Sequence, residues 1–200
     1  VLKNTYMLLG MTLLFSSVTA GISMAVGLSQ GMALILSLVG FGLIFVVQKT
    51  ADSSNGLIAI FAFTGVMGAA LGPMLNYYVA LPGGPALVMQ ALGGTALVFF
   101  GLSAYALTTR KDFSYMGGFL MVGLLVAVVA MIANIFLNIP ALSLTISAAV
   151  VMIMSGLILF DTSRIINGGE TNYIRATVSL YLNIYNLFIH LLRLLSSAQR

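Results

Sequence analysis

Seven long apolar stretches run through this sequence, each about as long as a helix that crosses the hydrocarbon of a bilayer. They cover roughly residues 5–26, 31–47, 56–79, 87–107, 115–137, 141–160 and 177–195. A spanning helix takes about 20 residues, so seven of them leave little of the 200-residue chain for a separate globular domain. We therefore predict an all-α integral membrane protein in which residues 1–200 form one bundle of seven transmembrane helices.

The basic residues fall in alternate connections between these stretches. Lys3 precedes the first stretch, Lys49 follows the second, Arg110 and Lys111 follow the fourth, and Arg164 and Arg175 follow the sixth. Lysine and arginine collect on the cytoplasmic side of membrane proteins, which predicts a cytoplasmic N-terminus and an outside C-terminus. Arg193 and Arg200 depart from this pattern, but Arg193 lies near the end of the last stretch and can extend its guanidinium to the far interface.

Composition excludes several function classes. Charged residues make up 6% of the chain, against about 25% in an average soluble domain. The eight Lys and Arg are too scattered for a nucleic-acid-binding face. With no Cys and one His, thiolate and histidine-rich metal sites are not expected, and no common catalytic motif is present. We expect a non-enzymatic protein without a cofactor, whose main surroundings are the lipid bilayer.

The N-terminal region bears on processing. The first apolar stretch follows Lys3 but is long enough to span, so we expect it to stay in the mature protein rather than to be a cleaved signal peptide. The sequence begins at Val1 rather than at Met, and we expect a short N-terminal tail that is either missing from this numbering or was removed.

The last stretch carries a polar stripe. On a helix that advances about 100° per residue, its members fall within about 80° of one another. They are Ser179, Asn183, Asn186, His190 and Arg193. Lipid would expel such a stripe, so we predict that the last helix is central in the bundle. Two interpretations stay open: polar contacts between helices, or the lining of a water-filled, ion-conducting path. For His190 a hydrogen-bonded interior histidine is favoured over a pH sensor.

Asp161 ends the sixth stretch at the predicted cytoplasmic boundary. Asn183 lies about two turns into the last stretch from the same side, so the two side chains are close enough in depth that they could meet. Lys49, Arg164 and Arg175 are candidate charge partners for the carboxylate. Asp161 is therefore the best candidate for a titrating gate, although it can also be a helix-end carboxylate exposed to water.

Small residues recur inside the third stretch. Gly68 and Gly72 form a small-xxx-small pair, which predicts close helix packing rather than a ligand site. Pro73 follows Gly72 and removes a backbone donor, so we expect a bend at this point.

Several runs of the sequence resemble the Bax-inhibitor (transmembrane Bax-inhibitor-motif) family, and more narrowly its bacterial YccA branch. The similarity extends from the first stretch to the last, and the segment between the sixth and seventh is its most specific part. The runs are Leu92 to Phe100 (LGGTALVFF), Thr108 to Asp112 (TTRKD), Ala133 to Leu137 (ANIFL), Phe160 to Gly168 (FDTSRIING) and Gly169 to Tyr181 (GETNYIRATVSLY). The resemblance implies a seven-helix fold with a central last helix and a location in the bacterial inner membrane.

The resemblance implies two functions. The YccA branch is associated with the membrane-anchored AAA protease FtsH, whose degradation of membrane proteins it restrains, and the expected N-terminal tail would be a handle for that protease. Other bacterial members are pH-sensitive calcium leaks, in which two aspartates share a proton at the cytoplasmic end of the pore. The first aspartate corresponds to Asp161, at which the resemblance implies a transient calcium contact, but the second corresponds to Asn183. An amide cannot titrate, so we expect weaker pH dependence here.

Overall fold

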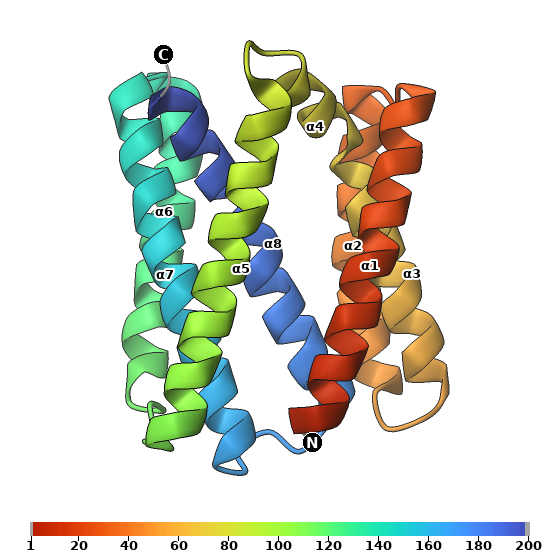
Figure 1. Ribbon diagram of the computed structural model, residues 1–200, viewed down its shortest axis with the longest axis vertical. Coiled ribbons are helices and arrows are strands. Elements are labelled where there is room, and N and C mark those ends of the chain that lie inside the picture. The colour runs from red at the N-terminus through yellow and green to blue at the C-terminus, as the bar shows by residue number, and fades with distance from the viewer. Residues whose placement is uncertain (1, 199–200) are drawn as a thin grey trace. The chain divides into compact units, whose positions relative to one another are not determined.

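The computed structural model describes residues 2–198, which are almost entirely helical (Figure 1). The helices are α1 (Leu2–Val26), α2 (Gln30–Thr50), α3 (Asn55–Ala70), α4 (Gly72–Val79), α5 (Gly84–Thr109), α6 (Met116–Leu137), α7 (Pro140–Ile166) and α8 (Tyr173–Ala198). Helices α3 and α4 together make one span, so this part of the chain has seven helices long and apolar enough to cross a membrane. The predicted fold class and number of spans are confirmed.

Two helix ends differ from the prediction. Helix α7 continues to Ile166, and α8 begins at Tyr173, each several residues beyond the apolar stretch on which the prediction rested. The backbone hydrogen bonds of a helix continue as readily through polar residues as through apolar ones, so a helix need not end where hydropathy falls. Asp161 therefore lies within α7, more than one turn before its end.

The chain divides by packing into two compact units. Unit 1 contains residues 1–85 and 170–181, and unit 2 contains residues 86–169 and 182–200. Helix α8 belongs to both, since its first residues pack in unit 1 and the remainder in unit 2. It is also the most buried of the seven spans, which agrees with the predicted interior position of the last helix.

In unit 1, α1 packs closely against α3 and α4 through glycines. A Cβ atom added at Gly68 would collide with the backbone of Ser16, and one added at Gly72 would collide with Ser23. The two serines use this proximity, because the Ser16 hydroxyl donates to the Thr64 carbonyl at 2.6 Å and the Ser23 hydroxyl donates to Ala69 at 2.7 Å. The predicted role of Gly68 and Gly72 in helix packing is confirmed.

The predicted bend near Pro73 is also confirmed. Helix α3 ends at Ala70, and α4 begins at Gly72 with Pro73 in its first turn, where a missing backbone donor costs least. Asn76 of α4 donates to the Met24 carbonyl of α1 at 3.2 Å, which fixes the second half of this broken span.

In unit 2, α6 packs on α7, again through small residues. An added Cβ at Gly117 would meet the ring of Phe160, and one at Gly156 would meet Leu120. The remaining surface of α6 is the most exposed of any span, with Phe119 and Phe136 both more than four-fifths exposed. Such apolar exposure along a whole helix suits contact with lipid.

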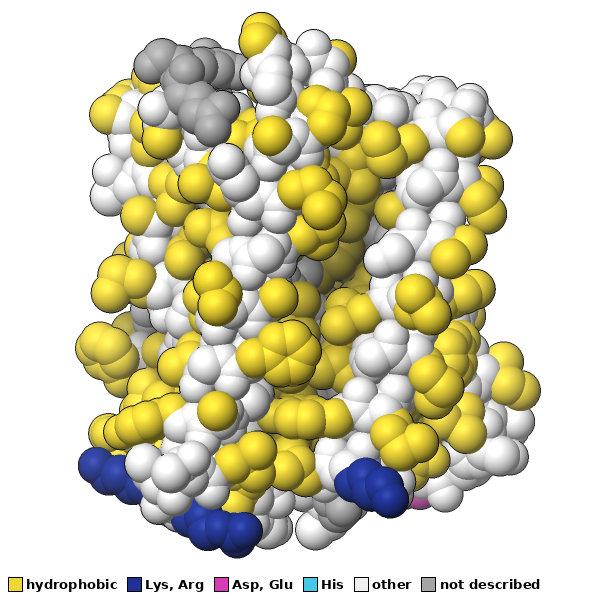
Figure 2. Space-filling view, viewed as in Figure 1, with side chains coloured by type: hydrophobic (Ala, Val, Ile, Leu, Met, Phe, Trp, Pro, Cys, Tyr) yellow, Lys and Arg dark blue, Asp and Glu magenta, His cyan; other side chains and the backbone are white. Residues whose placement is uncertain are grey.

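The visible surfaces of both units show the same distribution of side chains. Figure 2 shows hydrophobic side chains along the length of α5 in unit 2 and of α1 in unit 1, with Lys and Arg side chains only near a helix end in each. This is the pattern of helices that cross hydrocarbon and end among lipid headgroups. The orientation across the membrane stays a prediction from charge.

The contact at Gly68 gives a test of the packing in unit 1. We expect Gly68→Ala to destabilise the protein by about 1–3 kcal/mol, because the added methyl group must push α1 and α3 apart. Gly21→Ala, on the open side of α1, is the matched control and should change stability by no more than about 0.5 kcal/mol. Thermal unfolding of both variants in detergent measures the effect, and equal midpoints would contradict the close packing.

Candidate functional site

The two residues predicted to meet at the cytoplasmic boundary are in direct contact in unit 2. The Asn183 Nδ2 of α8 donates a hydrogen bond to the Asp161 Oδ2 of α7 at 2.7 Å. Both side chains are buried, with 9% of Asp161 and 6% of Asn183 exposed. An amide supplies donor hydrogens without adding a charge, so this bond stabilises the carboxylate without the repulsion of a second acid. The predicted approach of the two residues is confirmed.

The residue after Asp161 has an unusual environment. Thr162 is fully buried, and its hydroxyl oxygen makes no hydrogen bond in the described part of the chain. A buried hydroxyl without a hydrogen-bond partner is costly and uncommon. Thr162 is such a residue, and it lies next to the Asp161–Asn183 hydrogen bond.

Ser163 follows Asp161 and Thr162 in α7, and its side chain holds the turn between α5 and α6. Its hydroxyl accepts the Phe113 backbone N–H at 2.9 Å and donates to the Lys111 carbonyl at 3.1 Å. Sequence reasoning did not single out Ser163, although it lies in the run Phe160 to Gly168 that supports the family resemblance. The signal that could have identified Ser163 from the sequence is its place in a row of consecutive polar residues inside a helix.

Further along α8, His190 faces Ser147 of α7. The His190 Nδ1 lies 3.2 Å from the Ser147 hydroxyl, and both residues are buried. This agrees with the interpretation of His190 as a hydrogen-bonded interior histidine.

The other members of the predicted stripe are less buried. Asn186 donates to the Leu182 carbonyl of its own helix at 2.9 Å, and Ser179 and Arg193 are half-buried. The stripe is thus divided: Asn183 and His190 contact α7, whereas the Asn186 amide is satisfied within α8. Nothing in these contacts requires a continuous conducting path.

The three candidate charge partners of Asp161 have different surroundings. Arg175, in unit 1, contacts Asp52 at 3.4 Å and donates to the side chain and backbone of Gln48. Arg164 lies over the Phe160 ring, with its Cζ atom 5.6 Å from the ring centroid. Lys49 is exposed, and no ion pair is found for it within residues 2–198.

The Arg175 contacts belong to a polar cluster that fixes the start of α8 in unit 1. Asn172 donates to Asp52 at 2.9 Å and to the Ala51 carbonyl at 3.0 Å, and its own side-chain oxygen accepts the backbone N–H groups of Ile174 and Arg175. Asn172 therefore caps α8 and ties it to the turn between α2 and α3. Sequence reasoning missed this residue, although an Asn just before a helix is a usual capping signal.

The arrangement gives no sign of a resident metal. Across residues 2–198, no group of three or more His, Asp or Glu side chains is placed to hold a metal ion. Among the described residues, Asp161 is the acidic side chain that is buried in unit 2, and its carboxylate accepts the Asn183 amide.

Comparison with known proteins agrees with this architecture. The family model described as "Inhibitor of apoptosis-promoting Bax1" matches residues 1–200. A protein of Escherichia coli strain K12 named "Modulator of FtsH protease YccA" is 57% identical over 201 residues, which cover 100% of this chain and 91% of that protein. A protein named "Inner membrane protein YccA", from Escherichia coli O6:H1, has the same identity and coverage. An "Uncharacterized membrane protein" of Vibrio cholerae is 54% identical over 98% of this chain and 88% of its own length.

The Asp161–Asn183 bond can be tested by removing the amide donor. Asn183→Leu keeps a similar side-chain volume but leaves the buried carboxylate with one donor fewer, and we expect a loss of about 1–3 kcal/mol in stability. Asn186→Leu is the matched control on the same helix, because that amide bonds only the Leu182 carbonyl among the contacts found. Thermal unfolding in detergent compares the two, and a larger loss for Asn186→Leu would show that the Asp161 contact is unimportant.

Proposed function

This chain belongs to the Bax inhibitor family, and from that membership we propose that it modulates an FtsH protease in the bacterial inner membrane without catalysing a reaction itself. The observation that supports this most is the 57% identity, over the whole chain, to the relative named "Modulator of FtsH protease YccA". The similarity extends over all seven spans of the described residues.

The fold supports a modulator in the membrane. The chain is a multi-pass inner-membrane protein whose described residues are nearly all within helices or short turns. Within residues 2–198, the surfaces available to a partner are the lipid-exposed faces of the helices and the turns at the membrane surface. Interior polar pairs such as Asp161–Asn183 and His190–Ser147 then keep the helices in a defined arrangement rather than performing chemistry.

The proposal predicts a physical association and a change in proteolysis. Isolation of the tagged full-length protein from native membranes should recover the FtsH-type protease, and overexpression should slow the turnover of a membrane substrate of that protease. A matched seven-helix membrane protein from another family, expressed at the same level, controls for crowding of the membrane. If the protease is absent from the isolate and substrate turnover is unchanged, the proposal is wrong.

A second candidate function is a calcium or other cation leak through the helix bundle, which we propose because Asp161 and Asn183 form a buried bond at 2.7 Å. A carboxylate held by a neutral amide can close a path between helices and can contact a passing cation when the bond opens. The interior position of Asp161 and its hydrogen bond to Asn183 support this candidate.

Flux measurements in proteoliposomes test the leak. We expect calcium flux above that of empty vesicles between about pH 6 and 8, and a change in that flux for Asp161→Ala. Asn183→Asp should strengthen the pH dependence, because two facing carboxylates share a proton whereas a carboxylate and an amide do not. Flux equal to that of empty vesicles, or the same flux in Asp161→Ala, would rule out this function.

A further inference from the structure

The turn between α5 and α6 places cationic and aromatic side chains together at one end of unit 2. Lys111 lies over two neighbouring rings, with its ammonium 5.6 Å from the centroid of Phe113 and 5.9 Å from that of Tyr115. The Phe113 ring also packs against Tyr105 of α5 at 5.9 Å. Cation–π contacts of this kind hold the ammonium in place while leaving its three N–H donors available.

The turn is fixed by its own hydrogen bonds. Phe113 is buried, and Ser163 of α7 binds the backbone on both sides of Asp112. The Asp112 side chain accepts the Ser114 backbone N–H at 2.9 Å. Because these contacts hold the backbone, the turn itself loses little backbone freedom when its cations bind a ligand.

The positive charge of the turn is not neutralised. Arg110 and Lys111 are exposed, and within residues 2–198 no carboxylate forms an ion pair with either. Hydrogen bonds from Ser114 hold the pKa of Asp112 below its usual value, so this carboxylate is ionised at neutral pH. It is a single acid against two cations, and the turn keeps an excess of positive charge.

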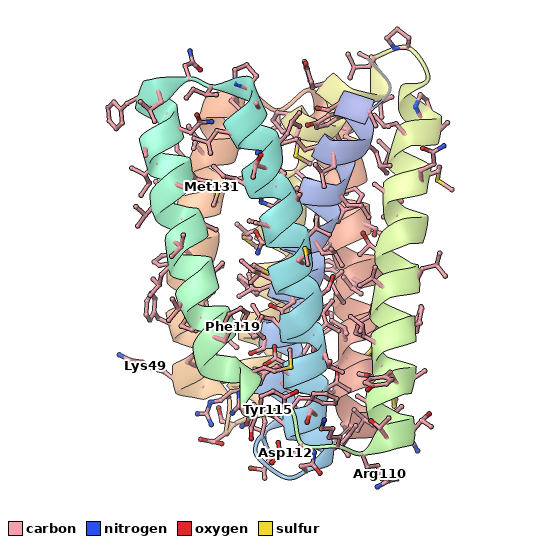
Figure 3. All side chains as sticks on the ribbon, turned by 90° about the vertical axis from the view of Figure 1, so that its left-hand side faces the viewer. Lys49, Arg110, Asp112, Tyr115, Phe119 and Met131 are labelled. Carbon is pink, nitrogen blue, oxygen red and sulfur yellow. The ribbon has the colours of Figure 1, made fainter. Side chains whose placement is uncertain are left out.

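The exposed aromatic residues next to the turn indicate how deep the turn lies in the bilayer. Tyr115 is 69% exposed, and Phe119, one turn further along α6, is 82% exposed. Figure 3 shows Arg110, Asp112 and Tyr115 at one end of this unit, with Phe119 further along α6 and Met131 towards its other end. An exposed Phe suits hydrocarbon, and a Tyr one turn away suits the interface, so the two cations lie at the level of lipid phosphates.

We infer that the α5–α6 turn is a binding site for the phosphate of an anionic phospholipid, with Arg110 and Lys111 as its donors and Tyr115 as the ring that borders the lipid. The site differs from a merely basic loop because the ammonium is positioned by two rings and the backbone by Ser163. Arginine supplies a planar pair of donors suited to phosphate, and lysine supplies a point charge beside it.

The absence of tryptophan in this chain makes a site-specific test practical. Tyr115→Trp keeps an aromatic ring beside Lys111 and introduces a single fluorescent reporter. Phe136→Trp, which is on the same helix near its other end and is also exposed, is the matched control reporter. In vesicles of phosphatidylcholine and phosphatidylglycerol, brominated phosphatidylglycerol should quench the Tyr115→Trp reporter more than brominated phosphatidylcholine does at equal mole fraction. The Phe136→Trp reporter should show no preference.

Charge removal then identifies the donors. In the Tyr115→Trp background, the double change Arg110→Gln and Lys111→Gln should reduce the preference for phosphatidylglycerol by up to roughly thirtyfold, since each basic residue near the surface contributes about fivefold. Lys49→Gln, which removes an exposed cation of unit 1, should leave the preference unchanged. Unfolding of each variant in phosphatidylcholine verifies that the fold is intact.

Four outcomes would overturn the inference. The first is a preference that survives the double change, and the second is an equal loss with Lys49→Gln, which would indicate diffuse attraction. The third is displacement of the lipid by inorganic phosphate but not by chloride at the same ionic strength, which would indicate a site for soluble phosphate. If the double change instead abolishes isolation of a protein partner while lipid preference is retained, the turn is a protein contact and the lipid site is wrong.

Discussion

The cost of placing polar groups in hydrocarbon determines how this chain packs. A hydrogen-bonding group that faces lipid loses its water and gains nothing, so each polar side chain of a spanning helix needs a partner inside the protein. Helix α8 carries most of these groups, and Asn183 and His190 find their partners on α7. Helix α6 has few such groups and is the most exposed span. The polar residues of α8 therefore explain why it is the most buried of the seven spans.

Adjacent residues of α7 connect the interior with the membrane surface. Asp161 binds α8, and Ser163 binds the turn between α5 and α6, with the unpaired hydroxyl of Thr162 between them. At the other unit, Asn172 and Arg175 tie the start of α8 to the turn between α2 and α3. Polar side chains at helix ends and in helix interiors thus perform the same task, which is to fix where α8 begins and how it meets its neighbours.

Much of the fold could be predicted because hydropathy and charge report directly on the surrounding solvent. The seven spans, the break at Gly72-Pro73, the interior position of α8 and the contact between Asp161 and Asn183 all follow from the cost of polar groups in lipid. The end of α7 at Ile166 could not be predicted in this way, because hydropathy marks where hydrocarbon ends and not where helical hydrogen bonds end. The partners of Arg175 and Ser163 depend on contacts between distant segments, to which a local pattern gives no access. The division into two packing units also depends on contacts between distant segments, so a local sequence pattern does not predict it.

The central claim is that the polar side of α8 is kept away from lipid, and labelling from within the bilayer tests it on the unmodified protein. A lipid-soluble reagent that generates a carbene on illumination inserts into whatever side chains face the hydrocarbon, and mass spectrometry locates the products. The account predicts heavy labelling at Phe119 and Phe136 of α6 and little between Asn183 and His190 of α8. Labelling of Asn183 and His190 as heavy as that of α6 would contradict it.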